Sequence, residues 1–227
     1  PEARSWTSKA LEITGGANVW SLMSVDEERD LVFLPTSSAS PNYYGGTRPG
    51  DNRYANSTLA LRGSTGELIW HFQIVHHDVW DWDMASQPMA IEVERDGKIN
   101  PVVVQLTKHG LVFVFDRATG KPFFPVEERP VPTDGVPNDI LSPTQPFPTA
   151  PPPLAPLSLS PDDAWGFTFY DKNACRRIIE NLRHGEVFTP PTTQGTAIMP
   201  GMVNNYGAGA FEPERNLLIT NPQRFPL

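Results

Sequence analysis

The sequence predicts an all-β fold in which short antiparallel strands are gathered into consecutive groups of four. Proline accounts for 25 of the 227 residues. This density excludes a mostly helical protein, because an interior proline loses a hydrogen bond and clashes with the preceding turn. Short apolar strings alternate with polar or glycine-containing turns. A Thr-Gly turn at Thr65 recurs at Thr119, about 54 residues later, which is a plausible period for the blades of a β-propeller.

Three blade-like groups are expected along the chain. The first group covers residues 17–73, with strands expected at 18–23, 31–34, 58–61 and 68–72. The second group covers residues 89–126, with strands at 89–93, 101–106, 111–115 and 123–124 and an Asp-Gly hairpin turn after the first strand. The third group, residues 196–227, repeats part of the first, because Glu214 to Ile219 resembles Glu28 to Phe33.

A proline-rich insertion, residues 127–195, separates the second group from the third. Thirteen prolines stand between residues 121 and 161, which indicates extended backbone, either a linker or an ordered excursion. One short helix is expected at residues 171–183, with Asp171 as its N-cap. Residues 1–227 are thus predicted to form a single partial propeller domain of about three blades.

Composition limits the classes of function. The net charge is −8, which argues against sequence-independent binding of nucleic acid. A single cysteine, Cys175, excludes an internal disulfide framework. No apolar run reaches the length of a membrane-spanning helix. The chain starts at Pro1 and enters strand-like sequence within its first twenty residues, so we expect both ends to be cuts within a larger protein.

The densest polar string, His76-His77-Asp78-Val79-Trp80-Asp81-Trp82-Asp83, follows directly on an expected strand. Imidazoles and carboxylates at this density are costly to bury unless they are paired. Three interpretations stay open: a divalent metal site, a general base shielded by aromatic walls, or a solvated loop whose tryptophans pack between blades. Lys108 lies in a turn of the next group, so it comes close to this loop if the two groups are adjacent blades.

Seven strings stand in order along nearly the whole chain: Asn18-Val19-Trp20-Ser21, Phe33-Leu34-Pro35, Tyr44-Gly45-Gly46-Thr47-Arg48, Gln73 to Asp83, Pro143-Thr144-Gln145-Pro146-Phe147, Phe188-Thr189-Pro190-Pro191 and Gln194-Gly195-Thr196. With this order and spacing the sequence resembles the quinoprotein dehydrogenases, most closely the membrane-bound quinoprotein glucose dehydrogenases. The resemblance implies an eight-bladed propeller that binds pyrroloquinoline quinone (PQQ) with a divalent cation, calcium or magnesium.

The resemblance also implies roles for individual residues. Asp81, the second aspartate of the His-His-Asp-x-Trp-Asp string, would be the general base that takes the substrate hydroxyl proton, with hydride passing to PQQ. Lys108 would stabilise charge on the quinone oxygens. The residues implied to contact the cofactor are Trp20, Ser40, His77, Lys108 and Asn221, with Ser40 also implied as a metal ligand.

For the whole protein the resemblance implies a sugar or alcohol substrate, such as a glucose-like aldose, and ubiquinone as electron acceptor. It implies a periplasmic location, with the parent protein anchored to the bacterial inner membrane and the remainder of the propeller as partner. The isolated segment is expected to be inactive, because about three blades do not close a ring. Two alternatives are a non-catalytic propeller scaffold and a metal-dependent hydrolase using His76, His77 and Asp78.

Overall fold

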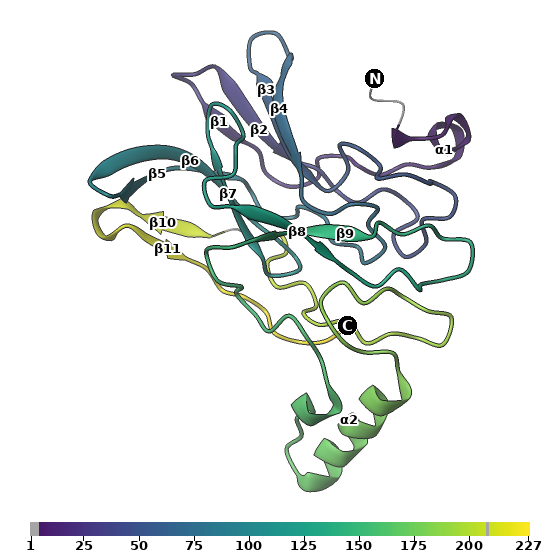
Figure 1. The fold of residues 1–227 in the computed structure, drawn as a ribbon. Helices are drawn as coiled ribbons and strands as arrows, with labels where there is room; N and C mark the ends of the chain where they lie inside the picture. The colour runs from purple at the N-terminus through teal and green to yellow at the C-terminus, as the bar shows by residue number, and fades with distance from the viewer. Residues whose placement is uncertain (1–4, 208) are drawn as a thin grey trace.

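The first blade-like group folds into a four-stranded antiparallel sheet in the computed structural model, which describes residues 5–207 and 209–227 (Figure 1). The strands follow one another in the order β1 (Ser24–Asp26), β2 (Leu31–Pro35), β3 (Ser57–Arg62) and β4 (Leu68–Gln73). The prediction of a strand at residues 18–23 is wrong. Ala17 and Asn18 bond instead to Ser38 and Ser37 in the loop that follows β2, so the edge strand begins only at Ser24.

The second group forms a three-stranded antiparallel sheet of β5 (Met89–Arg95), β6 (Lys98–Leu106) and β7 (Val112–Asp116). The predicted fourth strand at residues 123–124 is reduced to a single bridge between Phe115 and Pro122. Its two bonds run from the Phe123 N–H to the Val114 carbonyl and from the Asp116 N–H to the Lys121 carbonyl. The cause is local, because the flanking residues Pro122 and Pro125 have no N–H to continue the ladder.

Two hairpins complete the β-structure. In the third group, β10 (Ala210–Glu212) pairs with β11 (Leu217–Ile219) across a 3₁₀ turn at Pro213–Arg215. Inside the proline-rich insertion, β8 (Val126–Pro130) pairs with β9 (Thr144–Pro148). This stretch is therefore an ordered excursion lying against the sheets, one of the two readings that its proline content left open (Figure 1).

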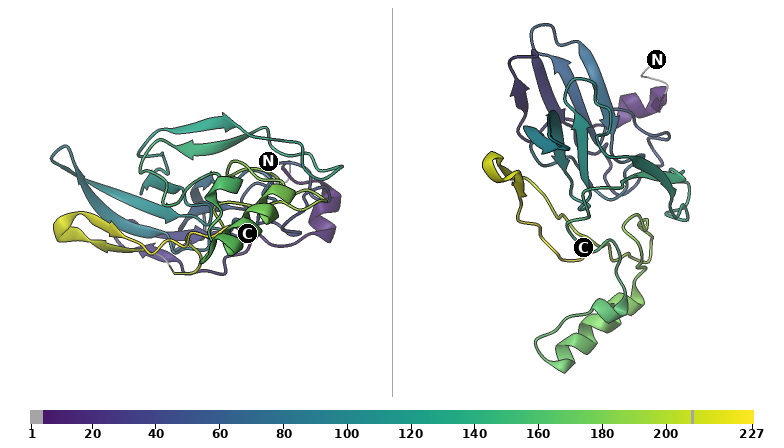
Figure 2. Two further views of the ribbon diagram at one scale, coloured as in Figure 1. Left: turned by 90° about the horizontal axis from the view of Figure 1, so that it is seen from below. Right: turned by 60° about the vertical axis from the view of Figure 1, so that its left-hand side comes forward.

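A helical arm projects from the far end of the insertion (Figures 1 and 2). Its helix α2 (Phe169–Asn181) begins two residues before the predicted start. Thr168 is the N-cap, and Asp171 closes a capping box from the third helical position rather than capping the helix itself. A further short helix that the sequence did not predict, α1 (Ser8–Ile13), is capped by Thr7. No helix within the described ranges is long and apolar enough to cross a membrane.

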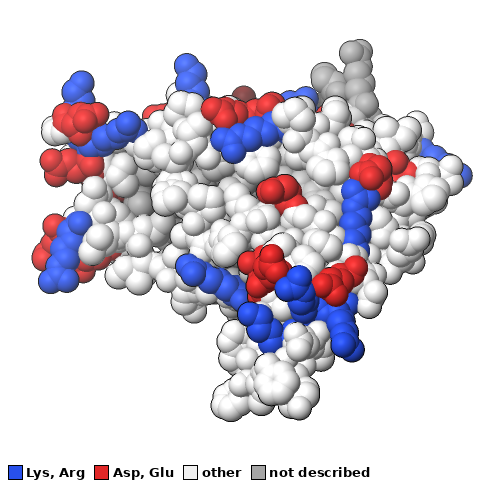
Figure 3. Space-filling view, turned by 60° about the horizontal axis from the view of Figure 1, so that its bottom comes forward, with Lys and Arg blue, Asp and Glu red and all other residues white. Residues whose placement is uncertain are grey.

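Two ion pairs hold the arm, one within it and one at its base. Arg176 pairs with Asp162 at 2.9 Å, and Arg183 pairs with Asp134 at 2.6 Å. Figure 3 shows charged side chains of both signs crowded around this part of the surface, whereas the outermost part of the projection is uncharged. Two aromatic side chains of the segment that precedes α2, Trp165 and Phe167, are exposed.

The core lies between the two sheets and fixes the second sheet against the first. Trp70 of β4 donates its indole N–H to the Arg117 carbonyl at 3.1 Å. Its ring lies so close to Gly120 that a Cβ added there would approach the ring to 2.5 Å. Gly120 has φ +69°, a left-handed conformation that favours glycine. The second Thr-Gly turn of the sequence, Thr119-Gly120, is thus the place where the second sheet packs on the first.

Candidate active site

The polar loop after β4 is organised around Asp78, which is 2% exposed. Its carboxylate accepts hydrogen bonds from the Trp80 and Trp82 backbone N–H groups at 2.9 Å. It also accepts from the Asn56 amide at 2.9 Å and from the Ser38 hydroxyl. Burial raises the pKa of Asp78, and these hydrogen bonds oppose the rise. Asp78 therefore fixes the turn that presents Asp81.

Aromatic packing holds the polar loop, residues 76–83, on the core. The Trp80 and Trp82 rings stack with centroids 5.0 Å apart, and Phe188 meets both edge-on. The Trp80 indole N–H donates to the Thr189 carbonyl at 2.8 Å. The two tryptophans are buried, so they hold the loop in place while the carboxylate between them in sequence stays partly accessible.

Asp81 and Lys108 meet, as the sequence predicted for turns of adjacent blades. Lys108 follows β6, and its Nζ donates to the Asp81 carbonyl at 2.9 Å and lies 3.4 Å from Asp81 Oδ2. The Asn42 amide donates to the other carboxylate oxygen, Oδ1, at 2.6 Å. The Asp81 side chain keeps 15% of its surface exposed, against 4% for Lys108. Asp81 has φ +63°, a conformation that aspartate and asparagine tolerate better than most residues.

The environment of Asp81 makes its carboxylate unusually basic. Burial raises its pKa to about 6, Lys108 lowers it, and the negative charges of Asp83 and Asp78 raise it. Tyr43 faces the same charges, and its own pKa is raised by burial first and then by Asp81. A carboxyl group poised near neutral pH is matched to the work of a general base.

Trp20 lies beside this pair. The Lys108 Nζ is 5.9 Å from the centroid of the Trp20 ring, within the range of a cation–π interaction. Tyr206 lies nearly parallel to Trp20, with ring centroids 6.0 Å apart. Trp20 is 42% exposed. The molecule therefore presents an aromatic surface next to a buried ammonium and a partly buried carboxylate.

The other predicted contact residues lie apart from this group. His77 is buried, and its ring nitrogens lie 2.7 Å from Asp139 Oδ1 and 2.7 Å from the Gly50 carbonyl. Ser40 is exposed, and its backbone N–H donates to the Gly15 carbonyl. Asn221 is exposed just after β11. Within the described residues, none of the three has a hydrogen bond to Asp81 or Lys108.

Two residues of the site were not singled out from the sequence. Asp83 Oδ2 lies 2.5 Å from the Lys108 Nζ, closer than any atom of Asp81. Asp83 belongs to the polar string His76 to Asp83, and a carboxylate in that string was the one sequence feature that pointed to it. Asn42 gave no local signal, because it is 39 positions from Asp81 in the chain.

The proposed metal ligands of a hydrolase point to different partners. His76 Nε2 lies 3.1 Å from Glu128, His77 contacts Asp139, and Asp78 accepts backbone and amide N–H groups. In the described part of the chain, no three His, Cys, Asp or Glu side chains are grouped so as to hold a metal ion. This arrangement gives the hydrolase hypothesis no support.

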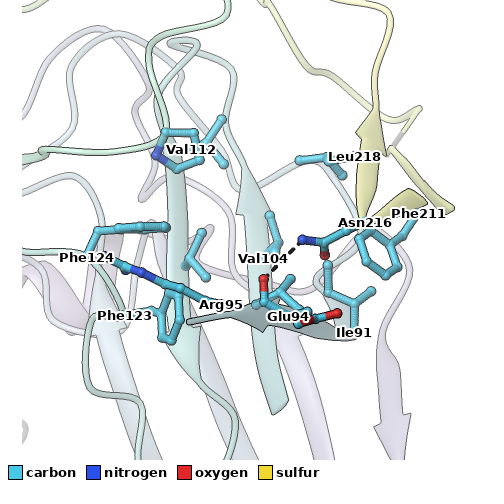
Figure 4. Close-up of a pocket in the computed structure, with 13 residues that line it drawn as sticks. Ile91, Glu94, Arg95, Val104, Val112, Phe123, Phe124, Phe211, Asn216 and Leu218 are labelled. Carbon is cyan, nitrogen blue, oxygen red and sulfur yellow. Dashed lines mark hydrogen bonds between the residues drawn. The ribbon is translucent and has the colours of Figure 1, made fainter. Parts of the chain in front are cut away.

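An apolar cavity lies apart from this site, on the face of the second sheet opposite the one that packs on the first sheet. It has a volume of about 400 Å³ and lies between β5–β7 and the β10–β11 hairpin (Figure 4). Apolar side chains such as Val104, Val112 and Leu218 line most of it, and the Asn216 amide bonds to the Glu94 carbonyl across one edge. Asp81 and Lys108 are not among its lining residues.

Comparison with known proteins adds a family to this geometry. The sequence model of the PQQ glucose/ethanol/alcohol dehydrogenase β-propeller domain matches residues 1–227. The quinoprotein glucose dehydrogenase of Escherichia coli K12 is 38% identical over 92% of this chain and 26% of its own length. The quinate/shikimate dehydrogenase (quinone) of Acinetobacter baylyi is 36% identical over 92% of this chain and 26% of its own length. The chain thus spans about a quarter of these relatives.

Solved structures agree on the fold. A europium-containing methanol dehydrogenase superposes with a TM-score of 0.63 at 21% identity, covering 94% of this chain and 31% of that one. The quinohemoprotein alcohol dehydrogenase of Comamonas testosteroni gives a TM-score of 0.62 at 23% identity, covering 96% of this chain and 27% of that one. At this level of identity the likeness concerns the propeller architecture alone.

Proposed function

Because this chain belongs to the glucose/ethanol/alcohol dehydrogenase β-propeller family of PQQ proteins, we propose that it is the active-site segment of a PQQ-dependent sugar or alcohol dehydrogenase. The observation that carries the proposal is the convergence of Asp81, Lys108 and Trp20 from three different parts of the chain. A non-catalytic scaffold would have no need for a basic carboxylate and an ammonium held together at a partly exposed site.

The residues present fit the chemistry of PQQ, a planar quinone that carries carboxylates. Trp20 offers an exposed ring face, and Lys108 offers an ammonium beside it. When bound, PQQ supplies the acceptor for the two electrons of the substrate C–H bond.

Asp81 acts on the substrate hydroxyl. With a pKa of about 6 its carboxylate is mostly ionised at neutral pH, yet it is more basic than an ordinary aspartate. Its 15% exposed side chain is open to a small hydroxyl group. Asn42 and Lys108 hold its two oxygens in place. Asp81 therefore accepts the hydroxyl proton, and the Lys108 ammonium stabilises negative charge that develops next to it.

We assign the divalent cation, calcium or magnesium, to oxygen ligands that include the exposed Ser40 hydroxyl. Calcium takes six to eight oxygen ligands, so most of them come from elsewhere in the full-length protein. His77, buried against Asp139, contributes to the cofactor site by fixing the loop that carries Asp81. Asn221, exposed after β11, is assigned to the edge of the cofactor site.

For the whole protein we propose about three of eight blades in residues 1–227, with blade groups 17–73, 89–126 and 196–227. The substrate is a glucose-like aldose or an alcohol, and ubiquinone accepts the electrons in a periplasmic, membrane-anchored enzyme. The named substrates of the relatives support this range: glucose, quinate or shikimate, and glycerol. The 227-residue segment alone is expected to be inactive, because unpaired sheet edges of an open ring favour association.

The test uses the full-length apoprotein. PQQ is added with calcium, and binding is followed by quenching of tryptophan fluorescence. Reduction of an artificial dye is then measured with glucose, quinate, glycerol and ethanol. We expect saturable quenching and turnover with at least one substrate only after PQQ is added. If no saturable PQQ binding is seen at any calcium concentration, the proposal is contradicted. Turnover that does not depend on PQQ would also contradict it.

A further inference from the structure

Lys108 is shared unequally between two carboxylates. Its Nζ lies 2.5 Å from Asp83 Oδ2 and 3.4 Å from Asp81 Oδ2. The Asp83 side chain is 11% exposed, and its other oxygen accepts the Ser38 backbone N–H at 2.6 Å. Asp83 thus has a short contact at both oxygens. Asp81 accepts the Asn42 amide at Oδ1 at 2.6 Å, and the ammonium reaches its other oxygen only at the longer distance.

We propose that Asp83 is a positioning residue for the reaction: it anchors the Lys108 ammonium away from the Asp81 carboxylate and so leaves that carboxylate free to accept a proton. This inference rests on the proposed function, because it concerns the same site. Asp83 does not itself touch the reacting atoms; it acts through Lys108.

The electrostatic argument follows from the distances. A lysine paired directly with Asp81 would hold that carboxylate in its ionised form and make it a weak base. Asp83 withdraws the ammonium and adds a negative charge of its own. The groups that face Asp81 are Lys108, Asp83, Asp78 and Tyr43. Among these, Asp83 is the one whose removal changes both the position of the cation and the nearby charge.

The same geometry supports a second role. Lys108 donates to the Asp81 backbone carbonyl as well as to Asp83. The ammonium therefore has two short acceptors on one loop, and its third contact is the long one to Asp81 Oδ2 at 3.4 Å. Without Asp83, the ammonium is free to turn toward the Asp81 carboxylate, and its position relative to the Trp20 ring changes with it.

The test compares the full-length Asp83→Asn variant with the unmodified protein. In a plot of kcat/KM against pH, the limb on the acid side is expected to move to lower pH by about one unit. The reason is that Asp81 loses a neighbouring negative charge and gains a closer cation. In the absence of PQQ, infrared difference spectroscopy follows the band of the protonated Asp81 carboxyl group across pH, with Asp81→Asn identifying the band. That titration is expected to move in the same direction and by the same amount.

Controls separate this role from a structural one. Asp96→Asn removes a carboxylate at an exposed hairpin turn, at the opposite end of β6 from Lys108. It is expected to leave both the acid limb of the kcat/KM profile and the infrared band unmoved. Asp83→Glu restores the charge, and it is expected to return the limb toward the wild-type position. If Asp83→Asn does not fold, Asp83→Ser removes the charge while its hydroxyl can still accept the Ser38 N–H.

The outcomes are distinguishable from failure of the proposed function. If Asp81→Asn abolishes PQQ-dependent turnover but the Asp83 variants leave both the limb and the band in place, the positioning role is wrong and the dehydrogenase assignment stands. If the full-length protein neither binds PQQ nor turns over, the proposed function fails; the infrared titration then still reports whether Asp83 controls Asp81.

Discussion

Lowering the pH from 7 to 5 is predicted to reduce kcat/KM about tenfold. Burial raises the pKa of Asp81 to about 6. A carboxyl group with that pKa is about 90% ionised at pH 7 and about 10% ionised at pH 5, and only the ionised form accepts the substrate proton. Activity is therefore present above the pKa and lost as the pH falls through it.

The assay is the initial rate of dye reduction by the full-length, PQQ-loaded protein at substrate concentrations well below KM. Ionic strength is held constant, and PQQ affinity and circular dichroism are measured at each pH to exclude loss of cofactor or of structure. An acid limb near pH 4, the ordinary range of aspartate, would refute the argument that burial has made Asp81 more basic. A flat profile between pH 5 and 7 would refute it equally.

Three further predictions concern single residues. Lys108→Met moves the acid limb of the kcat/KM profile to higher pH, because the ammonium lowers the pKa of Asp81. It also lowers the unfolding free energy in a denaturant titration by about 3 kcal/mol, because the buried Asp83 carboxylate loses its cation. Gly120→Ala costs about 3 kcal/mol in the same measurement, through backbone strain and collision with Trp70; Gly66→Ala, with positive φ but open space, costs only about 1 kcal/mol. Thr168→Ala removes the N-cap of α2 and speeds amide exchange in the arm by an amount equivalent to about 1 kcal/mol.

The blade-like groups were predictable because their signals are local. Apolar strings between polar or glycine-containing turns, and the repeated Thr-Gly turn, are set by residues a few positions apart. The strands β2, β3, β4, β6 and β7 all overlap the ranges that these patterns predicted. The failures arose where distant backbone groups decide the pairing. Residues 18–23 look like a strand, but Asn18 and its neighbour bond to the loop after β2, and nothing nearby in the sequence encodes that choice.

The candidate site was partly predictable for the same reason. Asp81 and Lys108 could be paired because both follow strands of neighbouring blades, and the structure brings them together. The sequence could not predict which of the two carboxylates, Asp81 or Asp83, lies nearer the Lys108 ammonium. Whether Lys108 lies nearer Asp81 or Asp83 depends on how Asp78 turns the loop, and that turn depends on hydrogen bonds from Asn56 and its neighbours far along the chain.

The most direct test of the central claim is the reductive half-reaction of the Asp81→Asn variant, measured in a single turnover with PQQ already bound. Asparagine tolerates the left-handed backbone of this position and keeps an oxygen to accept the Asn42 amide. We predict that PQQ affinity is retained while the rate falls by about 10²–10⁴. A rate within threefold of the wild-type value, with PQQ bound, would contradict the assignment of Asp81 as the general base.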